Sequence, residues 1–458
     1  MMSWISELKA ELGDCICTDA ATLQAHAADK WHAATLPEVV ALPTCTEEVA
    51  RILRFASRAG VPVTPRGAGV GYVGGCVPVR GGIVLSTARM NKILEVNPAD
   101  GVAVVEPGVL TADLQAACAE VGWFYPPDPA SRKESSIGGN IATNAGGPRC
   151  LKYGVTRAYV LGLKVVLADG RILTCGGRTH KNKQGFDLVG LFCGSEGMLG
   201  IITQATLRII PAPPARAALH ASFPRFALAA EAVQRVLQAG HLPCALEITD
   251  AFTLAAARRH LGPSVLPEDA QGHLILEIDG QQDAVFNELA ALHGLLAEIG
   301  ATEISPAYTE EAVEGIWQLR RGFSESLKAT GLTKLNEDIV IPRSQLVALV
   351  EFCAELQQVS GIPIACFGHS GDGNIHTNIM VLKDAEGNDL RAPADALLHR
   401  LFAWVLSHGG SITGEHGIGL AKAPWFPSAV GPVAMELHHA LKSALDPAGI
   451  LNPGKMGL

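Results

Sequence analysis

The sequence lacks the features that several protein classes require. Only 5% of its 458 residues are aromatic, its 11 cysteines form no C-x-x-C pair, and no stretch approaches the 18 apolar residues of a membrane span. The cysteine spacing therefore indicates neither a zinc ribbon nor an iron–sulfur cluster. Free thiols are typical of a reducing compartment, so we expect a cytoplasmic protein.

Basic runs are also absent, and the net charge is −9. A phosphate-contacting surface needs clustered Lys and Arg, so the composition argues against a nucleic-acid-binding protein. The hydrophobic content of 48% excludes disorder, and the length allows two or three packed domains. No long repeat or low-complexity segment occurs, which argues against a repeat scaffold.

A glycine-rich segment at residues 64–75 contains Gly69-Val-Gly71-Tyr-Val-Gly74, a literal match to GxGxxG. A Rossmann site also needs a helix that begins among the glycines, but Pro78 and a glycine pair follow and disfavour a helix. We therefore expect a loop whose backbone N–H groups surround an anion such as a diphosphate, with Arg66 adding positive charge. A tight turn between two strands is the alternative.

Two further segments are unusually rich in glycine. Residues 135–147 read SSIGGNIATNAGG, and residues 194–203 read GSEGMLGIIT. The first is predicted to be neither an ordinary strand nor an ordinary helix, and its amide and hydroxyl groups suit a flat polar heterocycle. The second is expected to lead into a strand whose backbone reaches the same ligand, while irregular surface loops are the alternative for both.

Histidines and carboxyl groups gather between glycines in the second half of the chain. His376 lies on a predicted strand, a turn can fold His369 back toward it, and Glu415 and His416 follow downstream. Two imidazoles and a carboxylate are typical of a divalent metal site with an open position. His416 would then be the general base, whereas purely structural histidines are the alternative.

Two cationic residues could bind an acidic substrate. Arg320 lies on a predicted helix, and Lys334 follows it. An arginine can bind a carboxylate through two parallel hydrogen bonds. A solvated helix face with i,i+4 ion pairs is the alternative.

The pattern of short strands and capped helices predicts an α+β protein. Thr44-Cys-Thr-Glu47 has the spacing of a capping box and predicts a helix that ends at Gly60. Pro211-Ala-Pro-Pro214 is the clearest linker. Beyond it, strands alternate with long helices, which indicates an antiparallel sheet with helices on one face.

Taken together, these motifs resemble the FAD-binding PCMH-type (vanillyl-alcohol-oxidase-like) flavoproteins, in the branch of D-lactate dehydrogenase, the glycolate oxidase large subunit and D-2-hydroxyglutarate dehydrogenase. The resemblance runs from Leu36-Pro-Glu-Val-Val40 to the segment 446–455, DPAGILNPGK. It implies an N-terminal helical segment (1–35) and a PCMH-type FAD-binding domain of two subdomains (36–214). A substrate domain (215–458) with a ferredoxin-like antiparallel sheet and C-terminal helices would follow.

The resemblance implies that FAD is bound without a covalent bond, because the diphosphate loop lacks the histidine that anchors the cofactor in some relatives. The cofactor-binding residues that it implies are Pro65, Arg66, Gly67, Ala68, Gly69, Val70, Gly71, Gly74, Gly75, Pro127, Ser136, Ile137, Gly138, Gly139, Asn140, Thr143, Asn144, Gly146, Gly147, Glu196, Gly197, Ile202 and Asn452.

The same resemblance implies oxidation of a D-2-hydroxy acid to the 2-oxo acid, with hydride transfer to flavin N5. A divalent ion, Zn or Mn, would polarise the C2 hydroxyl, and His416 would remove its proton. The implied metal ligands are His369, His376 and Glu415, and the implied substrate-binding residues are Arg320, Ser324, Lys334 and Asn378.

Reduced FAD would need an external acceptor, because the chain lacks cluster-type cysteines. The acceptor could be a quinone, a cytochrome, an electron-transfer flavoprotein or an iron–sulfur subunit. The sequence also leaves open whether the protein forms a homodimer and whether it attaches peripherally to the inner face of a membrane. Two other functions stay open. One is an aryl-alcohol or cresol oxidase, which the low aromatic content disfavours, and the other is a non-catalytic flavin subunit of a larger oxidase.

Overall fold

The structure, a computed structural model, describes residues 4–384 and 386–458 and divides into two compact units. The first unit comprises the chain up to Gly146 together with Gly154–Ala212 and Glu415–Leu458. The second comprises Gly147–Tyr153 and Pro213–Gly414. The tail after Gly414 therefore packs with the first unit. The predicted domain boundary at residue 214 stays a prediction.

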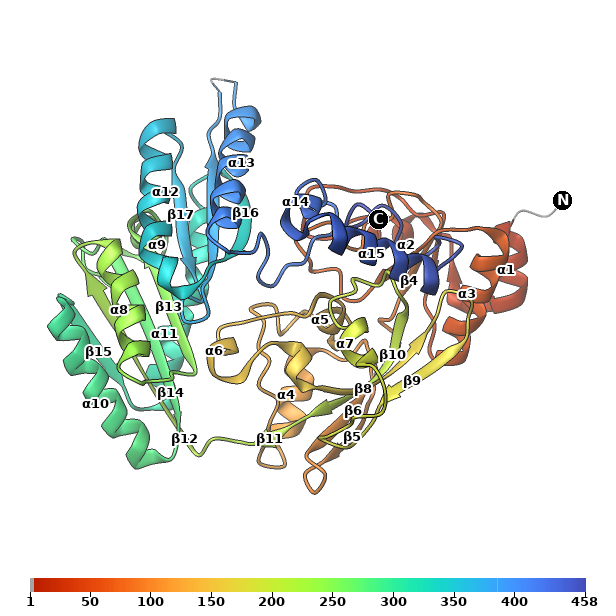
Figure 1. The fold of residues 1–458 in the computed structure, drawn as a ribbon, viewed down its shortest axis with the longest axis horizontal. Coiled ribbons are helices and arrows are strands. Elements are labelled where there is room, and N and C mark those ends of the chain that lie inside the picture. The colour runs from red at the N-terminus through yellow and green to blue at the C-terminus, as the bar shows by residue number, and fades with distance from the viewer. Residues whose placement is uncertain (1–3, 385) are drawn as a thin grey trace. The chain divides into compact units, whose positions relative to one another are not determined.

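The two larger sheets of the first unit appear in Figure 1. One sheet has the order β1-β2-β4-β3, in which β4 runs parallel to both neighbours; its strands are β1 (Ile16–Cys17), β2 (Val39–Ala41), β3 (Val63–Arg66) and β4 (Ile83–Ser86). The other is antiparallel with the order β5-β6-β10-β8-β9; its strands are β5 (Ile93–Asn97), β6 (Val102–Val105), β8 (Val160–Val166), β9 (Ile172–Gly176) and β10 (Ile201–Arg208).

The other elements of the first unit are a small ribbon and helices. A two-stranded ribbon pairs β7 (Trp123–Phe124) with β11 (Ile210–Pro211). The helices are α1 (Trp4–Leu12), α2 (Ala20–Ala25), α3 (Thr46–Ala59), α4 (Thr111–Ala119), α5 (Ile137–Thr143), α7 (Leu188–Phe192), α14 (Phe426–Val430) and α15 (Pro432–Leu445).

Helix α3 buries one apolar face and ends at Gly60 in the left-handed conformation, as predicted. The predicted capping box is wrong: the N-cap residue is Cys45, and Thr44 instead donates its backbone N–H to the Glu48 carboxylate at 2.7 Å. The core beneath α3 joins both sheets, since Ile83 of β4 and Ile201 of β10 belong to the same buried cluster. This shared core fixes the loops that leave the two sheets.

The second unit is built on one antiparallel sheet of seven strands in the order β15-β12-β14-β13-β17-β18-β16. The strands are β12 (Ala215–Phe223), β13 (Ala245–Asp250), β14 (Gly272–Gly280), β15 (Glu303–Ala307), β16 (Thr333–Val340), β17 (Ile364–Gly368) and β18 (Asn374–Val381). The helices are α6 (Cys150–Tyr153), α8 (Phe226–Gln238), α9 (Ala251–Leu261), α10 (Gln282–Ile299), α11 (Glu310–Lys328), α12 (Leu346–Ser360) and α13 (Arg391–Ser407).

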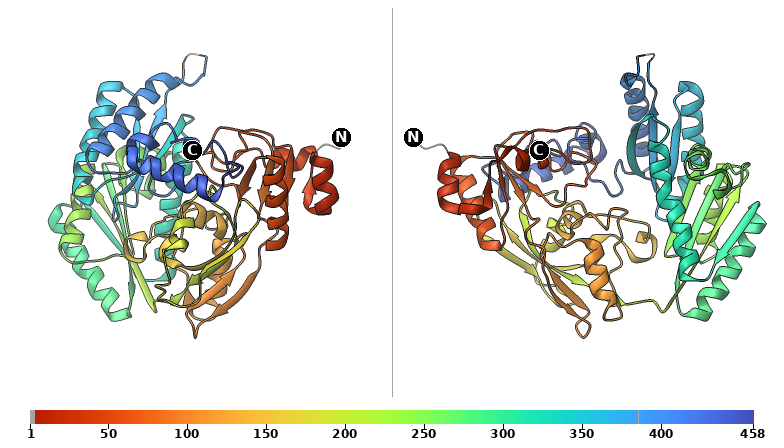
Figure 2. Two further views of the ribbon diagram at one scale, coloured as in Figure 1. Left: turned by 45° about the vertical axis from the view of Figure 1, so that its right-hand side comes forward. Right: turned by 180° about the vertical axis from the view of Figure 1, so that it is seen from behind.

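Helices cover both faces of this sheet, not one face as predicted. Helices α9 and α11 pack on one face, and α8 and α10 lie on the other (Figures 1 and 2). The physical reason lies in strands such as β14, whose residues 272–279 are all buried. A strand that is buried on both sides needs cover on both sides. None of the helices in residues 4–384 and 386–458 combines the length and apolar composition of a membrane crossing.

The strand register places His376, Asp338 and Glu247 of the second unit on a single face. His376 of β18 lies opposite Phe367 of β17 and Asp338 of β16. Phe367 in turn lies opposite Thr249 of β13, so Glu247, two residues before Thr249, points to the same side. This is the face that α9 and α11 cover, and it positions the site described next.

Candidate functional site

Three of the predicted cofactor segments meet in the first unit. A Cβ atom on Gly67 would lie 2.5 Å from Ser136 Oγ, so these two segments are in close contact. Asn452 donates its Nδ2–H groups to the backbone oxygens of Gly75 at 3.0 Å and Glu196 at 2.7 Å. Segments that are far apart in the sequence therefore form one cradle of backbone.

The segment 135–147 forms a helix, contrary to the prediction. Helix α5 begins after Ser136, whose hydroxyl accepts the Gly139 N–H at 3.4 Å, and it ends at Asn144 in the left-handed conformation. Gly138 does not break the helix because it allows close packing: a Cβ atom there would lie 2.6 Å from the Pro107 Cβ. Glycine here serves tertiary packing, which overrides its low helix propensity.

The cradle offers chemistry that fits a flavin dinucleotide. Asn452 is fully buried, and its Oδ1 has no hydrogen-bond partner within residues 4–384 and 386–458. A buried acceptor without a partner is costly unless a ligand satisfies it. The loop after β3 runs through Gly69 and Gly74 at φ of 71° and 72°, a conformation that lets successive N–H groups turn toward an anion.

Several predicted cofactor residues use their side chains within the protein. The Arg66 guanidinium donates to the backbone oxygen of Ala28 at 2.7 Å and to Cys76 Sγ at 3.2 Å. The Asn140 amide donates to Thr111 Oγ1 at 2.6 Å. Other predicted residues lie in the same unit, with Ile202 on β10 and Pro127 accepting from a glutamine side chain.

Glu196 holds the loop that follows His416. Its buried carboxylate accepts the N–H groups of Ile418 at 2.7 Å and Gly419 at 2.8 Å. Burial raises the pKa of this carboxyl, and the two N–H groups oppose that rise. The His416 ring lies 5.3 Å from the ring of Tyr72, which belongs to the cofactor loop. The predicted base is therefore positioned by residues of the cofactor segments.

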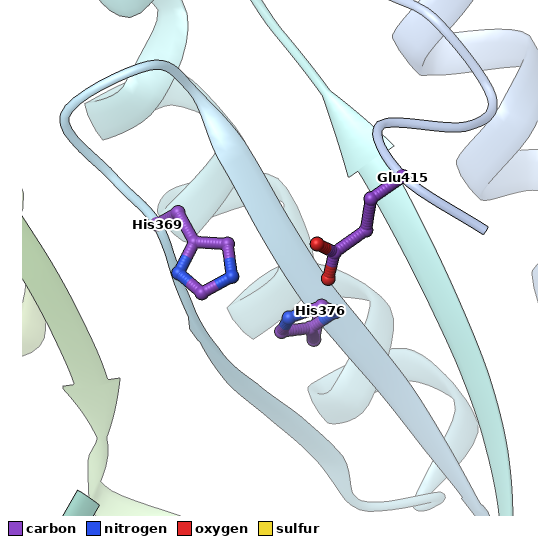
Figure 3. A group of neighbouring side chains, drawn as sticks. All are labelled: His369, His376 and Glu415. Atoms are coloured by element: carbon purple, nitrogen blue, oxygen red, sulfur yellow. The ribbon is translucent and has the colours of Figure 1, made fainter. Parts of the chain in front are cut away.

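The predicted metal ligands form one group (Figure 3). His369 directly follows β17 and His376 lies on β18, and both are buried. Glu415 follows Gly414, whose N–H is bound to the Asp338 carboxylate at 2.8 Å. One ligand atom from each of the three residues lies within 4.8 Å of the other two. Two imidazole nitrogens and a carboxylate oxygen are a donor set that suits Zn or Mn.

The predicted substrate-binding residues also converge in the second unit. Ser324 is one turn beyond Arg320 on α11, and Lys334 Nζ donates to Ser324 Oγ at 3.1 Å. Burial, followed by the nearby positive charge of Lys328, lowers the pKa of Lys334 to about 8. Asn378 is fully buried on β18, and its Oδ1 finds no hydrogen-bond donor among the described residues.

The sequence reasoning missed Glu247. This fully buried carboxylate accepts from Arg320 Nε at 2.6 Å and from His369 Nδ1 at 2.5 Å. Burial alone would raise the pKa of Glu247, but the facing Arg320 and His369 hold it at about 2. The Arg320 guanidinium also lies over the Phe367 ring at 4.8 Å. A single acidic residue within the apolar run Ala245-Leu-Glu-Ile was the available signal.

Comparison with known families matches the two parts of the chain to two models. Residues 37–176 match the family "FAD binding domain", and residues 212–456 match "FAD linked oxidases, C-terminal domain". The chain is 39% identical to the glycolate oxidase subunit GlcD of Bacillus subtilis (strain 168), over 92% of this chain and 89% of that protein. It is 34% identical to a D-lactate dehydrogenase of Anaerostipes hadrus, with the same coverage of both chains.

The fold is similar to that of a solved p-cresol methylhydroxylase with substrate bound. The TM-score is 0.79 over 99% of this chain and 96% of that one, at 20% identity. This likeness confirms the predicted PCMH-type α+β fold.

Proposed function

The chain belongs to the family of FAD-linked oxidases, and we propose that within this family it oxidises a D-2-hydroxy acid to the corresponding 2-oxo acid. The observation that carries the proposal is that two groups of side chains meet beside the seven-stranded sheet, where Glu247 contacts both Arg320 and His369. The His369, His376 and Glu415 donors suit a metal that binds a hydroxyl, and Arg320 and Lys334 suit a carboxylate. A 2-hydroxy acid carries both functions on adjacent carbons.

Each residue has a distinct role in the proposed reaction. Arg320 and Lys334 bind and orient the substrate carboxylate. His369, His376 and Glu415 would hold the divalent ion, a Lewis acid that lowers the pKa of a bound hydroxyl. His416 accepts the hydroxyl proton as the general base.

FAD, when bound, supplies the two-electron redox chemistry by accepting the C2 hydride. Asn452 and the loop after β3 would hold it, and the electrons would pass to an external acceptor. Similarity to a protein named as a subunit supports a partner protein as that acceptor.

The test of this proposal is a dye-reduction screen over D- and L-2-hydroxy acids with purified, FAD-loaded protein. We expect reduction with D-lactate, glycolate or D-2-hydroxyglutarate and little with L-lactate. Turnover only with aromatic alcohols would instead favour an aryl-alcohol oxidase. Absence of turnover with every acid, in protein that retains FAD and metal, would favour a non-catalytic subunit.

Acid precipitation is expected to release FAD into the supernatant. The cofactor loop from Arg66 to Gly75 contains no histidine, and its only tyrosine, Tyr72, packs against His416. Absorbance of the supernatant near 450 nm, a typical flavin band, measures the release. Yellow colour that stays with the precipitated chain would contradict non-covalent binding.

Arg320→Lys is expected to raise KM for the hydroxy acid by about tenfold or more. A lysine has a single point charge, so the two-pronged contact with a carboxylate, worth about 1.5 to 3 kcal/mol, is lost. Steady-state dye reduction measures KM and kcat separately. Arg321→Lys is the matched control, because the Arg321 side chain is 47% exposed and binds Glu314 on the same helix. An unchanged KM in Arg320→Lys would remove Arg320 from substrate binding.

KM is also expected to rise with pH above about 8. The Lys334 amino group, with its pKa lowered to about 8 mainly by burial, is charged below that pH and neutral above it. A neutral amine attracts a carboxylate less, so substrate affinity falls as pH increases. Lys334→Arg keeps its charge throughout this range and should abolish the rise. A KM that stays flat from pH 7 to 9.5 in the unaltered protein would contradict this role.

A further inference from the structure

We infer that Glu247 is a positioning residue that aligns the substrate-binding Arg320 and the metal ligand His369 together; the inference rests on the proposed function. One oxygen of its carboxylate, Oε2, lies 2.6 Å from both Nε and Nη2 of Arg320. The other, Oε1, lies 2.5 Å from His369 Nδ1. A single side chain thus contacts one member of each proposed binding group.

The contact with His369 selects the form of imidazole that can bind a metal. An ionised carboxylate can only accept a hydrogen bond, so Nδ1 of His369 must carry the proton. In a neutral ring the lone pair is then on Nε2, which is the nitrogen available to a cation. A carboxylate in this position also orients the ring and increases its basicity as a ligand.

The contact with Arg320 fixes the plane of the guanidinium. Glu247 takes the edge formed by Nε and Nη2, and Phe367 lies against the guanidinium face at 4.8 Å. The other edge, formed by Nη1 and the second N–H of Nη2, is left for a substrate carboxylate and can bind it through two hydrogen bonds. Glu247 therefore determines which part of Arg320 a substrate meets.

The charges of the three residues balance. The Glu247 side chain is fully buried and that of Arg320 is 11% exposed, so the attraction between their opposite charges offsets part of the desolvation cost of both. With His369 neutral, the group carries no net charge. If Glu247 only stabilised the fold, its replacement would lower the stability of the protein and nothing else. A positioning role predicts that the folded variant also loses affinity for the metal and for the substrate.

Glu247→Gln is the test, in FAD-loaded protein from which metal has been removed with a chelator. A glutamine cannot accept from His369 and bind Arg320 with the same two atoms, because one of its terminal groups is a donor. Titration with ZnCl₂ should give a Kd for Zn²⁺ about 10 to 100 times higher than in the unaltered protein. KM for the hydroxy acid should rise several-fold in the metal-reloaded variant. ¹⁵N shifts of His369 should show the proton moving from Nδ1 toward Nε2.

Glu277→Gln is the matched control. Glu277 is a second buried carboxylate, on the adjacent strand β14, and it accepts from Trp317 and pairs with Arg216 at 3.5 Å. This variant should lose stability but keep the Zn²⁺ affinity of the unaltered protein. Equal affinities in all three proteins, or an equal loss in both variants, would overturn the inference.

If Glu247→Gln does not fold, Glu247→Asp replaces it. Aspartate is shorter by one methylene group and cannot reach both partners, so Zn²⁺ affinity should again fall, and an unchanged affinity would overturn the inference. Failure of the proposed function gives a different result. Unaltered protein that binds Zn²⁺ but oxidises no hydroxy acid overturns the proposed reaction, while the Zn²⁺ titration still decides the role of Glu247. Unaltered protein that binds neither Zn²⁺ nor Mn²⁺, titrated in the same way, overturns both.

Discussion

His416→Ala is expected to lower kcat by roughly two to four orders of magnitude while most of the metal and the FAD stay bound. The size of the loss is that of a positioned general base. His416 Nε2 lies 4.0 Å from Glu415 Oε1, and the metal-ligand group contains Glu415 but not His416. Asn452 holds the FAD cradle through its hydrogen bonds to the backbone of Gly75 and Glu196. Removal of the ring should therefore affect chemistry more than binding.

The companion variants His369→Ala and His376→Ala should lose metal and activity together, because each lacks one of three ligands. Elemental analysis measures the bound metal and dye-coupled kinetics measure kcat, so together they separate loss of activity alone from loss of metal and activity. His439→Ala, which removes an exposed histidine on α15, is the control and should retain both metal and activity. A metal-free His416→Ala protein would make His416 a ligand, and a fully active His369→Ala protein would remove the metal from the mechanism.

The sequence allowed correct prediction of those elements in which local pattern and tertiary packing agree. Strands such as β6 and β14 are apolar runs bounded by turn residues, and α3 has a regular apolar face that ends at a glycine. The loop after β3 was also predicted correctly, because Pro78 and the glycines that follow leave no helix for a Rossmann site.

The errors arise where distant residues decide the local conformation. Helix α5 contains two glycines and would not be stable alone, but Gly138 packs against Pro107 and Ser136 caps the first turn. Spacing alone suggested a capping box at Thr44, although α3 begins two residues later. Helices on both faces of the second sheet follow from full burial of its strands, which a short apolar run does not reveal.

Glu247 illustrates the same limit for the site. The histidines and Glu415 stand in glycine-rich surroundings that attract attention in a sequence, whereas Glu247 lies inside an ordinary strand. Its role depends on Arg320 from α11 and on His369 after β17, which only the fold brings together. Residues that position a site from within a regular element are therefore the ones that sequence reasoning misses most easily.

Asp446→Ala is expected to destabilise the first unit by about 3 to 5 kcal/mol, the usual effect of removing one partner of a buried ion pair. The Asp446 carboxylate accepts from Lys442 Nζ at 2.6 Å and from the backbone N–H of Leu451 at 2.8 Å. Burial lowers the pKa of Lys442, and the hydrogen bond that its ammonium group donates to Asp446 offsets part of that effect. Without Asp446, the buried Lys442 ammonium would keep only backbone carbonyls as acceptors and lose its counter-charge, and the N–H groups of Ile450 and Leu451 would lose their acceptor.

The consequence should reach FAD binding, because this turn leads directly to the cradle. Asn452 donates its backbone N–H to Val63 of β3 at 2.8 Å and its side chain to Gly75 and Glu196. Urea titration followed by flavin fluorescence should show FAD release at clearly lower urea in Asp446→Ala. Asp169→Ala is the matched control, since Asp169 binds Arg171 in the same unit but on the surface, where a pair contributes at most about 1 kcal/mol. Equal shifts in the two variants would mean that the Lys442–Asp446 pair contributes no more than a surface pair.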